Sequence, residues 1–198
     1  MPGNIDSIVG FTVHQGLDAR GAAALAEAAR RALRHFPWLN RKSFAVGAAT
    51  LEVWGHGDVG RRVHRTPDGR LLVLAGSPVA PNDWPLLCAS PDPDSFRLPW
   101  DGRAVLLHLS ADGATWSMWN DWCGSIPVFH APAGQGRVAG TLEPVVAAAA
   151  RLTADHISMP ALVALLVHGH FLGDWTLYRD MKVVPPDCFA QWTPAGFQ

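Results

Sequence analysis

The chain has 198 residues, and its 16 Lys and Arg side chains against 17 Asp and Glu give a formal net charge of −1. Such a balance provides no basic field to attract a phosphate backbone, so we expect no nucleic-acid partner. Only 17% of the residues are charged, 48% are hydrophobic and nine are tryptophan. This composition excludes global disorder and indicates one well-packed domain over residues 1–198.

The cysteines and the N-terminus bear on the compartment. Cys88, Cys123 and Cys188 are odd in number, widely spaced and without a C-x-x-C pair, so we expect no disulfide framework and no zinc site. The first residues lack the basic and apolar regions of a signal peptide, and no apolar run is long enough to cross a bilayer. The sequence therefore predicts a cytoplasmic protein without a membrane segment, metal or cofactor.

The first part of the chain alternates between strand and helix signals. Residues 8–14 are β-branched and aromatic and predict a strand. Asp18 is a suitable N-cap for a helix over 22–35, which Pro37 follows. Further strand-like runs, separated by Gly-rich turns, predict an antiparallel meander. They cover residues 43–54, 61–64 and 70–74.

The second part begins with a Pro-, Asp- and Ser-rich stretch over 78–99, where we expect irregular structure or a short helix. Two antiparallel strand pairs and two helices follow. The pairs are 104–110 with 115–120 and 126–130 with 137–140, the helices are 142–152 and 158–167, and short extended runs close the chain at 175–178 and 181–184. This order, without strand-helix-strand alternation, predicts an α+β domain.

The predicted strand over 115–120 carries tryptophans on both faces. Side chains alternate along a strand, so Trp116 and Met118 share one face and Trp119 points to the other. If the first face is buried, Trp119 must be covered by a helix layer or by a partner. Core packing is the simpler interpretation, and an interface is the alternative.

Several motifs resemble the N-terminal glutaminase-like domain of the asparagine synthetase family. Residues 120–129 read Asn-Asp-Trp-Cys-Gly-Ser-Ile-Pro-Val-Phe, similar to a strand-turn-strand segment of that domain. The run Gly-Asp-Trp-Thr-Leu-Tyr at 173–178, followed by Met-Lys-Val-Val-Pro-Pro at 181–186, resembles its closing signature. Further similarities lie at 72–76, at 100–103 and at 140–143. Together these motifs cover most of the chain, most strongly after Trp100.

The resemblance implies an N-terminal-nucleophile type fold, a four-layer αββα sandwich of two antiparallel sheets between helices. In active members the second residue is Cys, and its own α-amine activates the thiol that attacks the glutamine side-chain amide. An Asn side chain and a Gly N–H form the oxyanion hole.

This chain departs from that pattern at its centre. Position 2 is Pro, and Ala75 stands where the oxyanion Asn is expected, while Gly76 is kept. Loss of the thiol costs several orders of magnitude in rate, and loss of an oxyanion donor about 10²-fold more. We therefore expect no catalytic residue, only a vestigial pocket. Its candidate residues are Pro2, Ala75, Gly76, Asp101 and Gly102. The candidates for a substrate-binding arginine are Arg41, Arg61 and Arg62, without a choice between them.

The absence of a nucleotide-binding motif suggests that a partner domain or subunit uses the ATP. ATP-using members carry a Ser-Gly-Gly-x-Asp-Ser phosphate loop in a following domain, and neither that loop nor another nucleotide-binding motif is present. The last residues resemble the junction before that domain. We therefore expect a degenerate glutaminase-like domain that supports an asparagine-synthetase-like synthetase domain or subunit. The resemblance to β-lactam synthetases and lasso-peptide cyclases, which also lack the Cys, suggests amide or lactam formation in natural-product biosynthesis.

Alternatives from other classes remain. An amidohydrolase or glutaminase would need a substitute nucleophile or base, such as the Pro2 amine or Ser7 after cleavage. Cys123 precedes Gly-Ser in a turn, but a buried or structural thiol is the simpler interpretation. His168 and His170 form an imaginable metal pair without a third ligand at an established spacing. Ligand binding in the vestigial pocket is a further possibility.

Overall fold

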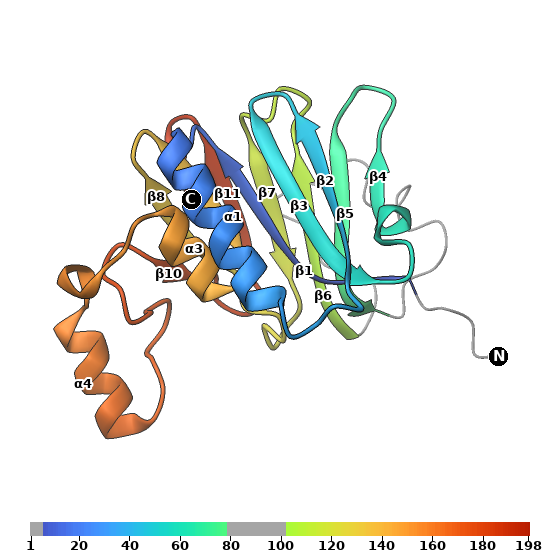
Figure 1. The fold of residues 1–198 in the computed structure, drawn as a ribbon. Helices are drawn as coiled ribbons and strands as arrows, with labels where there is room; N and C mark the ends of the chain where they lie inside the picture. The colour runs from blue at the N-terminus through green and yellow to red at the C-terminus, as the bar shows by residue number, and fades with distance from the viewer. Residues whose placement is uncertain (1–5, 79–101) are drawn as a thin grey trace. The chain divides into compact units, whose positions relative to one another are not determined.

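The computed structural model describes residues 6–78 and 102–198 (Figure 1). The strands are β1 (Ser7–Gln15), β2 (Asn40–Val46), β3 (Ala49–His56), β4 (Val63–Arg65), β5 (Leu71–Pro78), β6 (Gly102–Leu109), β7 (Trp116–Asn120), β8 (Phe129–Ala133), β9 (Gly136–Gly140), β10 (Lys182–Val183), β11 (Phe189–Thr193) and β12 (Gly196–Phe197). The helices are α1 (Ala19–Leu33), α3 (Glu143–Ala149) and α4 (Met159–His168), with 3₁₀ turns η1 (Val59–Arg62) and η2 (Ala154–His156).

The chain forms two compact units that share strand β1. The first unit comprises residues 1–11, 38–126 and 186–198, and the second comprises 12–37 and 127–185. Ile8 of β1 pairs with Ala75 of β5 in the first unit, and Thr12 pairs with Gly140 of β9 in the second. The β1–β5 pair is parallel, whereas we expected only antiparallel pairs. The difference arises because α1 and the β2–β4 segment connect β1 to β5, which leaves room for a crossover.

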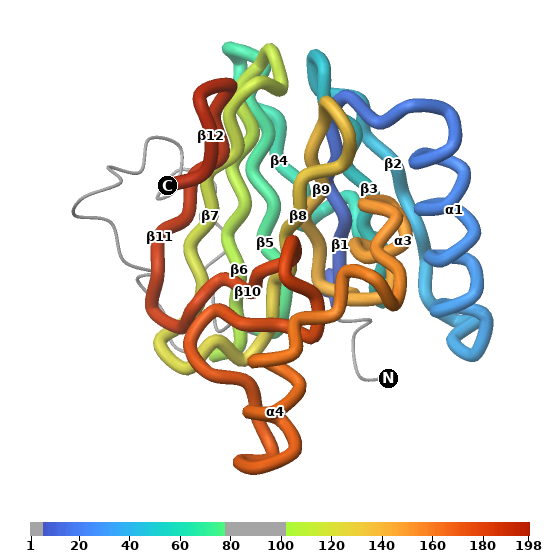
Figure 2. The backbone as a smooth tube through the Cα atoms, turned by 90° about the vertical axis from the view of Figure 1, so that its left-hand side faces the viewer, coloured from blue at the N-terminus to red at the C-terminus, as the bar shows by residue number. Residues whose placement is uncertain are grey.

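In the first unit, β4, β5, β6, β7, β11 and β12 form an antiparallel ladder, and β2 and β3 form a hairpin (Figure 2). Apolar side chains fill both faces of β5 and β6, because these strands lie inside the ladder. Val73 and Leu107 are buried on one face, and Leu72 and Leu106 pack with Trp119 on the other. The core of this unit therefore surrounds β5 and β6.

In the second unit, α1 and α3 pack together with β8 and β9. Leu25 and Ala29 of α1 meet Val145 and Val146 of α3, and Met181 closes the same cluster. Asp18 caps α1 as predicted, since its Oδ1 accepts a hydrogen bond from the Gly21 N–H at 2.7 Å. The helix pair over 142–152 and 158–167 is confirmed as α3 and α4, with shifted ends.

Some expected boundaries are wrong. The run over 43–54 is a hairpin, not one strand, because Gly47 turns the chain at φ +53° and the Ala48 N–H donates to the Asp112 carbonyl at 2.8 Å. Pro132 belongs to β8, so the second predicted turn lies two residues later than expected. Strands β11 and β12 were not predicted. The expectation for 78–99 falls on residues outside the described ones, apart from its first residue, which ends β5.

Trp119 is covered within its own unit. The two tryptophans of β7 point to opposite faces as predicted, and both are buried, Trp119 to 3% exposure. Its ring lies 4.9 Å from that of Phe189 on β11, between ring centroids. Core packing is therefore the correct interpretation of Trp119.

In the part of the chain that the structure describes, no helix has the length and hydropathy needed to cross a membrane.

Candidate functional site

Three of the five residues expected in the vestigial pocket lie at one end of the β5–β6 pair. Gly76 of β5 is opposite Ala104 of β6, and Gly102 is opposite the last residue of β5, Pro78. Ala75 precedes Gly76 and pairs with Ile8 of β1. Pro2 and Asp101 lie outside the described residues. The fold thus brings Ala75, Gly76 and Gly102 together at the start of β1.

Ala75 is fully buried between neighbouring strands, with Ile8 on one side and Val105 on the other. A methyl group donates no hydrogen bond, so this side chain cannot stabilise a developing oxyanion. Its contribution is packing in the ladder.

Gly76 occupies a position that only glycine fits. Its φ is +100°, and a Cβ there would lie 2.1 Å from the Arg103 carbonyl oxygen and 2.8 Å from Ile126 Cδ1. Both the dihedral and the contacts exclude a side chain. The backbone of β5 and β6 therefore approaches closely at this edge.

The Asp121 carboxylate organises the turn beside this edge. Its Oδ2 accepts the Ala104 N–H at 3.0 Å, and its Oδ1 accepts the N–H groups of Cys123 and Ser125 at 3.1 and 3.0 Å. Ser125 Oγ donates to the same Oδ1 at 3.0 Å. Burial acts to raise the pKa of Asp121, but the Ser125 and Ala104 N–H groups outweigh it and hold the pKa below its ordinary value.

Cys123 takes part in the same turn. Its Sγ donates to Asp121 Oδ1 at 3.2 Å and lies 2.9 Å from Ser125 Oγ. The geometry therefore supports the structural interpretation of Cys123. Cys188 contributes its backbone, since its N–H donates to Asn120 Oδ1 at 2.9 Å; Cys88 lies outside the described residues.

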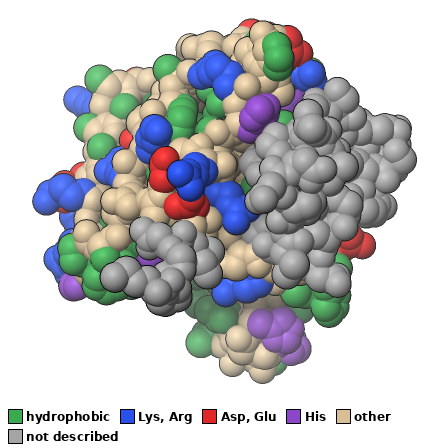
Figure 3. Space-filling view, turned by 90° about the vertical axis from the view of Figure 1, so that its right-hand side faces the viewer, with side chains coloured by type: hydrophobic (Ala, Val, Ile, Leu, Met, Phe, Trp, Pro, Cys, Tyr) green, Lys and Arg blue, Asp and Glu red, His purple; other side chains and the backbone are tan. Residues whose placement is uncertain are grey.

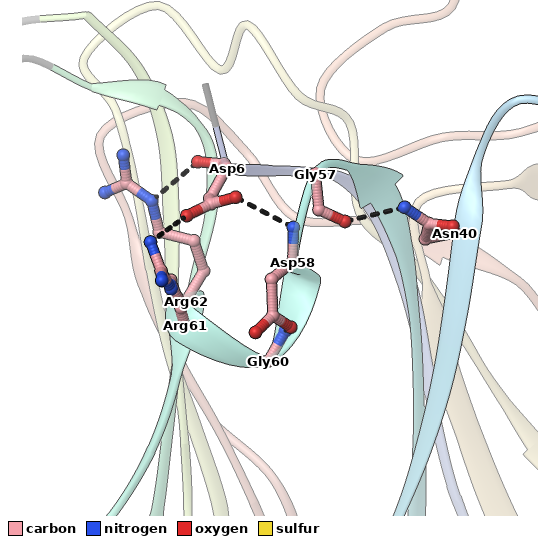
Figure 4. A network of polar contacts seen from close by, with 7 residues as sticks. All are labelled: Asp6, Asn40, Gly57, Asp58, Gly60, Arg61 and Arg62. Carbon is pink, nitrogen blue, oxygen red and sulfur yellow. Dashed lines mark hydrogen bonds and ion pairs between the residues drawn. The ribbon is translucent and has the colours of Figure 1, made fainter. Parts of the chain in front are cut away.

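The chain enters β1 through a polar network around Asp6 (Figure 4). Asp6 Oδ1 accepts the Asp58 N–H at 2.8 Å, and Oδ2 lies 3.2 Å from Arg61 Nη1. The Asp6 carbonyl oxygen accepts a hydrogen bond from Arg62 Nε at 2.9 Å. Gly57 makes this close approach possible, because a Cβ there would lie 2.3 Å from Asp6 Oδ1. The η1 turn therefore holds both the side chain and the backbone of Asp6.

This network separates the three candidate arginines. Arg61 and Arg62 reach the start of β1, whereas Arg41 is ion-paired with Glu52 across the β2–β3 hairpin. A space-filling view shows Lys and Arg side chains gathered around acidic ones on one face of the molecule (Figure 3). Arg61 and Arg62 are thus the arginines placed beside the edge that carries Ala75 and Gly76.

Sequence reasoning missed the roles of Asp6 and Asp121. For Asp121 a local signal existed, since an Asp shortly before a Gly-Ser pair, here in Asp-Trp-Cys-Gly-Ser, is typical of a turn in which the carboxylate caps backbone N–H groups. For Asp6 none existed, because its partners lie more than fifty positions away in the sequence.

The histidine pair does not form a metal site. The rings of His168 and His170 are 6.2 Å apart between centroids, and His170 Nδ1 lies 3.0 Å from the His168 carbonyl oxygen. Over residues 6–78 and 102–198, no group of three or more His, Cys, Asp or Glu side chains is placed to hold a metal ion.

One histidine of the first unit, on β6, is half-buried. His108 faces Ser117 of β7 and Leu72 of β5. Burial, with a smaller effect of the Arg70 charge, lowers the pKa of His108 to about 4. Its Nε2 has no hydrogen-bond partner among the described residues. With a pKa of about 4, the half-buried His108 is neutral at pH 7.

Comparisons with known proteins place the fold. No family model and no curated protein sequence matches the chain. A structure of the allosteric regulatory enzyme of purine biosynthesis matches with a TM-score of 0.51 and 11% identity, over 96% of this chain and 48% of that one. Glutamine phosphoribosylpyrophosphate amidotransferase from B. subtilis, complexed with ADP and GMP, matches with a TM-score of 0.51 and 12% identity over the same shares.

These matches show similarity of fold alone, and the chain spans about half the length of each neighbour. The chain therefore has a mixed α and β fold similar to that of a glutamine amidotransferase. This agrees with the glutaminase-like fold that the sequence motifs predicted. Neither neighbour is an asparagine synthetase.

Proposed function

We propose that this chain is a catalytically degenerate glutamine amidotransferase-like domain that supports a synthetase domain or subunit of the asparagine synthetase family. The observation that carries the proposal is Ala75, a buried methyl group at the strand edge where the resemblance expects the oxyanion carboxamide. Because position 2 is Pro, we propose that neither the thiol nor the carboxamide oxyanion donor of the active members is retained. We propose Pro2, Ala75, Gly76, Asp101 and Gly102 as the remnant of the pocket.

The contacts of Asp6 support the loss of substrate recognition by an arginine at the start of β1. The carboxylate is bound by Arg61 and the Asp58 N–H, and the backbone carbonyl by Arg62. A guanidinium that would otherwise be available to a substrate carboxylate is thus engaged by the chain itself. The carboxylate of Asp6 therefore takes the place beside Arg61 that the carboxylate of a substrate would need.

The proposed partner uses ATP to activate a carboxylate, and this chain contributes a docked scaffold. The structural neighbours carry the shared fold as about half of a longer chain, which agrees with a second functional domain beside it. In family members without the Cys, such as β-lactam synthetases and lasso-peptide cyclases, the substrate supplies the amine, so ammonia production is dispensable. We extend this to the present chain and propose a role in natural-product amide or lactam formation in the cytoplasm.

The proposal includes the arrangement of the whole fold. We propose that residues 1–198 form one glutaminase-like domain, with the four-layer αββα order of the family. The packing of α1 and α3 beside β8 and β9 supports one helical layer of that order.

The rival function is an amidohydrolase that uses a substitute nucleophile. Ser7 is the candidate with a described environment, and it is 6% exposed within β1. Its carbonyl oxygen lies so close to Gly55 that a Cβ there would come within 1.8 Å. In the intact chain Ser7 is therefore an interior strand residue, which weighs against this rival.

Ammonia release from glutamine, combined with the intact mass of the purified chain, decides between the two functions. We expect no release above background, and equal results for the parent chain, Ser7→Ala and Cys123→Ala. Release that disappears when the N-terminal amine is blocked, or in Ser7→Ala, would establish the rival function. Co-purification with a phosphate-loop synthetase encoded beside this chain tests the partner, and a stable complex is the expected result.

A further inference from the structure

Helix α4 carries an apolar stripe on the side that faces away from its own unit. Its buried residues are Ala161 and Ala164. The large apolar side chains that remain exposed are Met159, Val163, Leu166 and Val167. They follow the spacing i, i+4, i+7 and i+8, so they line one face of the helix. We call this face the α4 stripe.

The helix that carries the stripe is firmly anchored at its N-terminal end. Ile157 bridges Tyr178, the Ser158 N–H donates to the Leu177 carbonyl at 2.9 Å, and the Arg179 N–H donates to the His156 carbonyl at 3.0 Å. Figures 1 and 2 both show α4 extending away from β8 and β10 of its unit. The stripe is therefore presented on a fixed helix that its own unit leaves uncovered.

The absence of charged side chains around the α4 stripe limits the kind of surface that can bind it. Residues 157–173 contain no Asp, Glu, Lys or Arg. Two identical faces of this kind can meet without repulsion between like charges. A helix that lies on a lipid surface typically has Lys and Arg along its polar face, which α4 lacks.

We propose that the α4 stripe is a self-association surface, whose occupant is the α4 stripe of a second copy of this chain. The two helices run antiparallel about a two-fold axis near Val163, so that Met159 of one copy faces Val167 of the other. An isologous contact of this kind closes at two copies. In an antiparallel pair the two helix dipoles point in opposite directions, and this arrangement is favourable.

The polar residues at the two ends of α4 are also compatible with an antiparallel pair. Asp155 is exposed just before α4, and His168 and His170 are exposed at its other end. In an antiparallel pair the carboxylate of one copy comes beside the imidazole N–H donors of the other. A parallel pair would bring the two carboxylates together instead.

The size of the surface sets the strength of the contact. A ten-residue helix is about 15 Å long, so the pair buries well under the ~800 Å² per partner of a standard interface. The expected dimer is reversible, with a dissociation constant on the order of 10⁻⁵ to 10⁻⁴ M.

Sedimentation equilibrium of the full chain, from low micromolar concentration up to about 1 mM, tests the proposal. We expect the average mass to rise toward that of a dimer. Val163→Glu and Val163→Lys should each remain monomeric, because like charges would meet at the two-fold axis. Their equimolar mixture should regain the dimer. Leu166→Glu provides a second disrupting variant, and circular dichroism checks that every variant is folded.

Trp122→Glu is the matched control, since Trp122 and Leu166 are both 76% exposed but lie in different units. It should associate like the parent chain. A parent chain that stays monomeric at the highest concentration overturns the proposal, as does a dimer that survives Val163→Glu or a mixture that stays monomeric. Flotation of the chain with phosphatidylcholine vesicles that Leu166→Glu abolishes would assign the stripe to a lipid surface and also overturn it.

Discussion

Asp121 and Ala104 are joined by two hydrogen bonds in opposite directions. The Ala104 N–H donates to the Asp121 carboxylate at 3.0 Å, and the Asp121 N–H donates to the Ala104 carbonyl at 3.0 Å. This pair attaches the turn after β7 to the beginning of β6. The Gly76 edge and the Asp121 turn therefore form one connected structure.

Asp121→Asn should destabilise the chain by about 2–3 kcal/mol, because the amide has only one oxygen for donors that now reach both carboxylate oxygens. Urea unfolding followed by circular dichroism measures the change. Asp112→Asn is the control: that carboxylate accepts two hydrogen bonds at an exposed turn, and its loss should cost clearly less than that of Asp121. Equal costs at the two sites would refute the special role of Asp121.

Gly76→Ala should cost more than about 2 kcal/mol, since the new Cβ would overlap the Arg103 carbonyl oxygen and the dihedral is unfavourable for alanine. Gly134→Ala offers a matched comparison, because its φ is also positive, +64°, but the space around it is open. There only the dihedral cost of about 1 kcal/mol is expected. A Gly76→Ala chain as stable as Gly134→Ala would show that β5 and β6 can separate at this edge.

Acid should destabilise the chain through His108. Burial lowers its pKa to about 4, from 6.5 when unfolded, so between these values the unfolded state binds a proton that the native state does not. Stability therefore falls as the pH is lowered from about 6.5 to 4, by up to about 3 kcal/mol for this group. His108→Leu should remove that part of the pH dependence, as measured by urea unfolding at a series of pH values. Ser117→Ala, at the opposite position of β7, should shift stability equally at every pH. An unchanged pH slope in His108→Leu would contradict the prediction.

Trp119 and Phe189 should be energetically coupled. Their ring centroids are 4.9 Å apart with planes inclined at 42°, a geometry worth about 0.5–1.5 kcal/mol beyond the buried area. A double-mutant cycle of Trp119→Leu and Phe189→Leu, measured by chemical unfolding, should return a coupling energy of this size. Additive single effects would mean that Phe189 only fills space.

The sequence predicted the elements whose signals are local. Helix α1 was found from Asp18 and the helical spacing that follows it, and the β6–β7 hairpin from its Asp-Gly turn. The β2–β3 hairpin was missed because Gly47 and Ala48 continue an apolar run, and the turn depends on the distant Asp112. Which side of α4 is buried could not be predicted, since apolar residues lie all around that helix.

Some residues of the candidate site could be predicted from local motifs, and others could be placed only with the fold. Ala75, Gly76 and Gly102 were identified from motifs, and the structure brings them together because β5 and β6 pair in register. The choice between Arg41 and the pair Arg61 and Arg62 needed the fold, because η1 meets the start of β1 only after long-range pairing. Pro2 and Asp101 remain predictions.

Strand β1 makes the two units interdependent during synthesis of the chain. Its partners are β5, complete at residue 78, and β9, complete at residue 140, and β11 and β12 of the first unit close only at residue 197. The second unit therefore lacks its last strand, β10, until residue 183 has been made, and the first unit lacks β12 until residue 197. A break in the chain between β1 and β5 would separate β1 from its partners in both units.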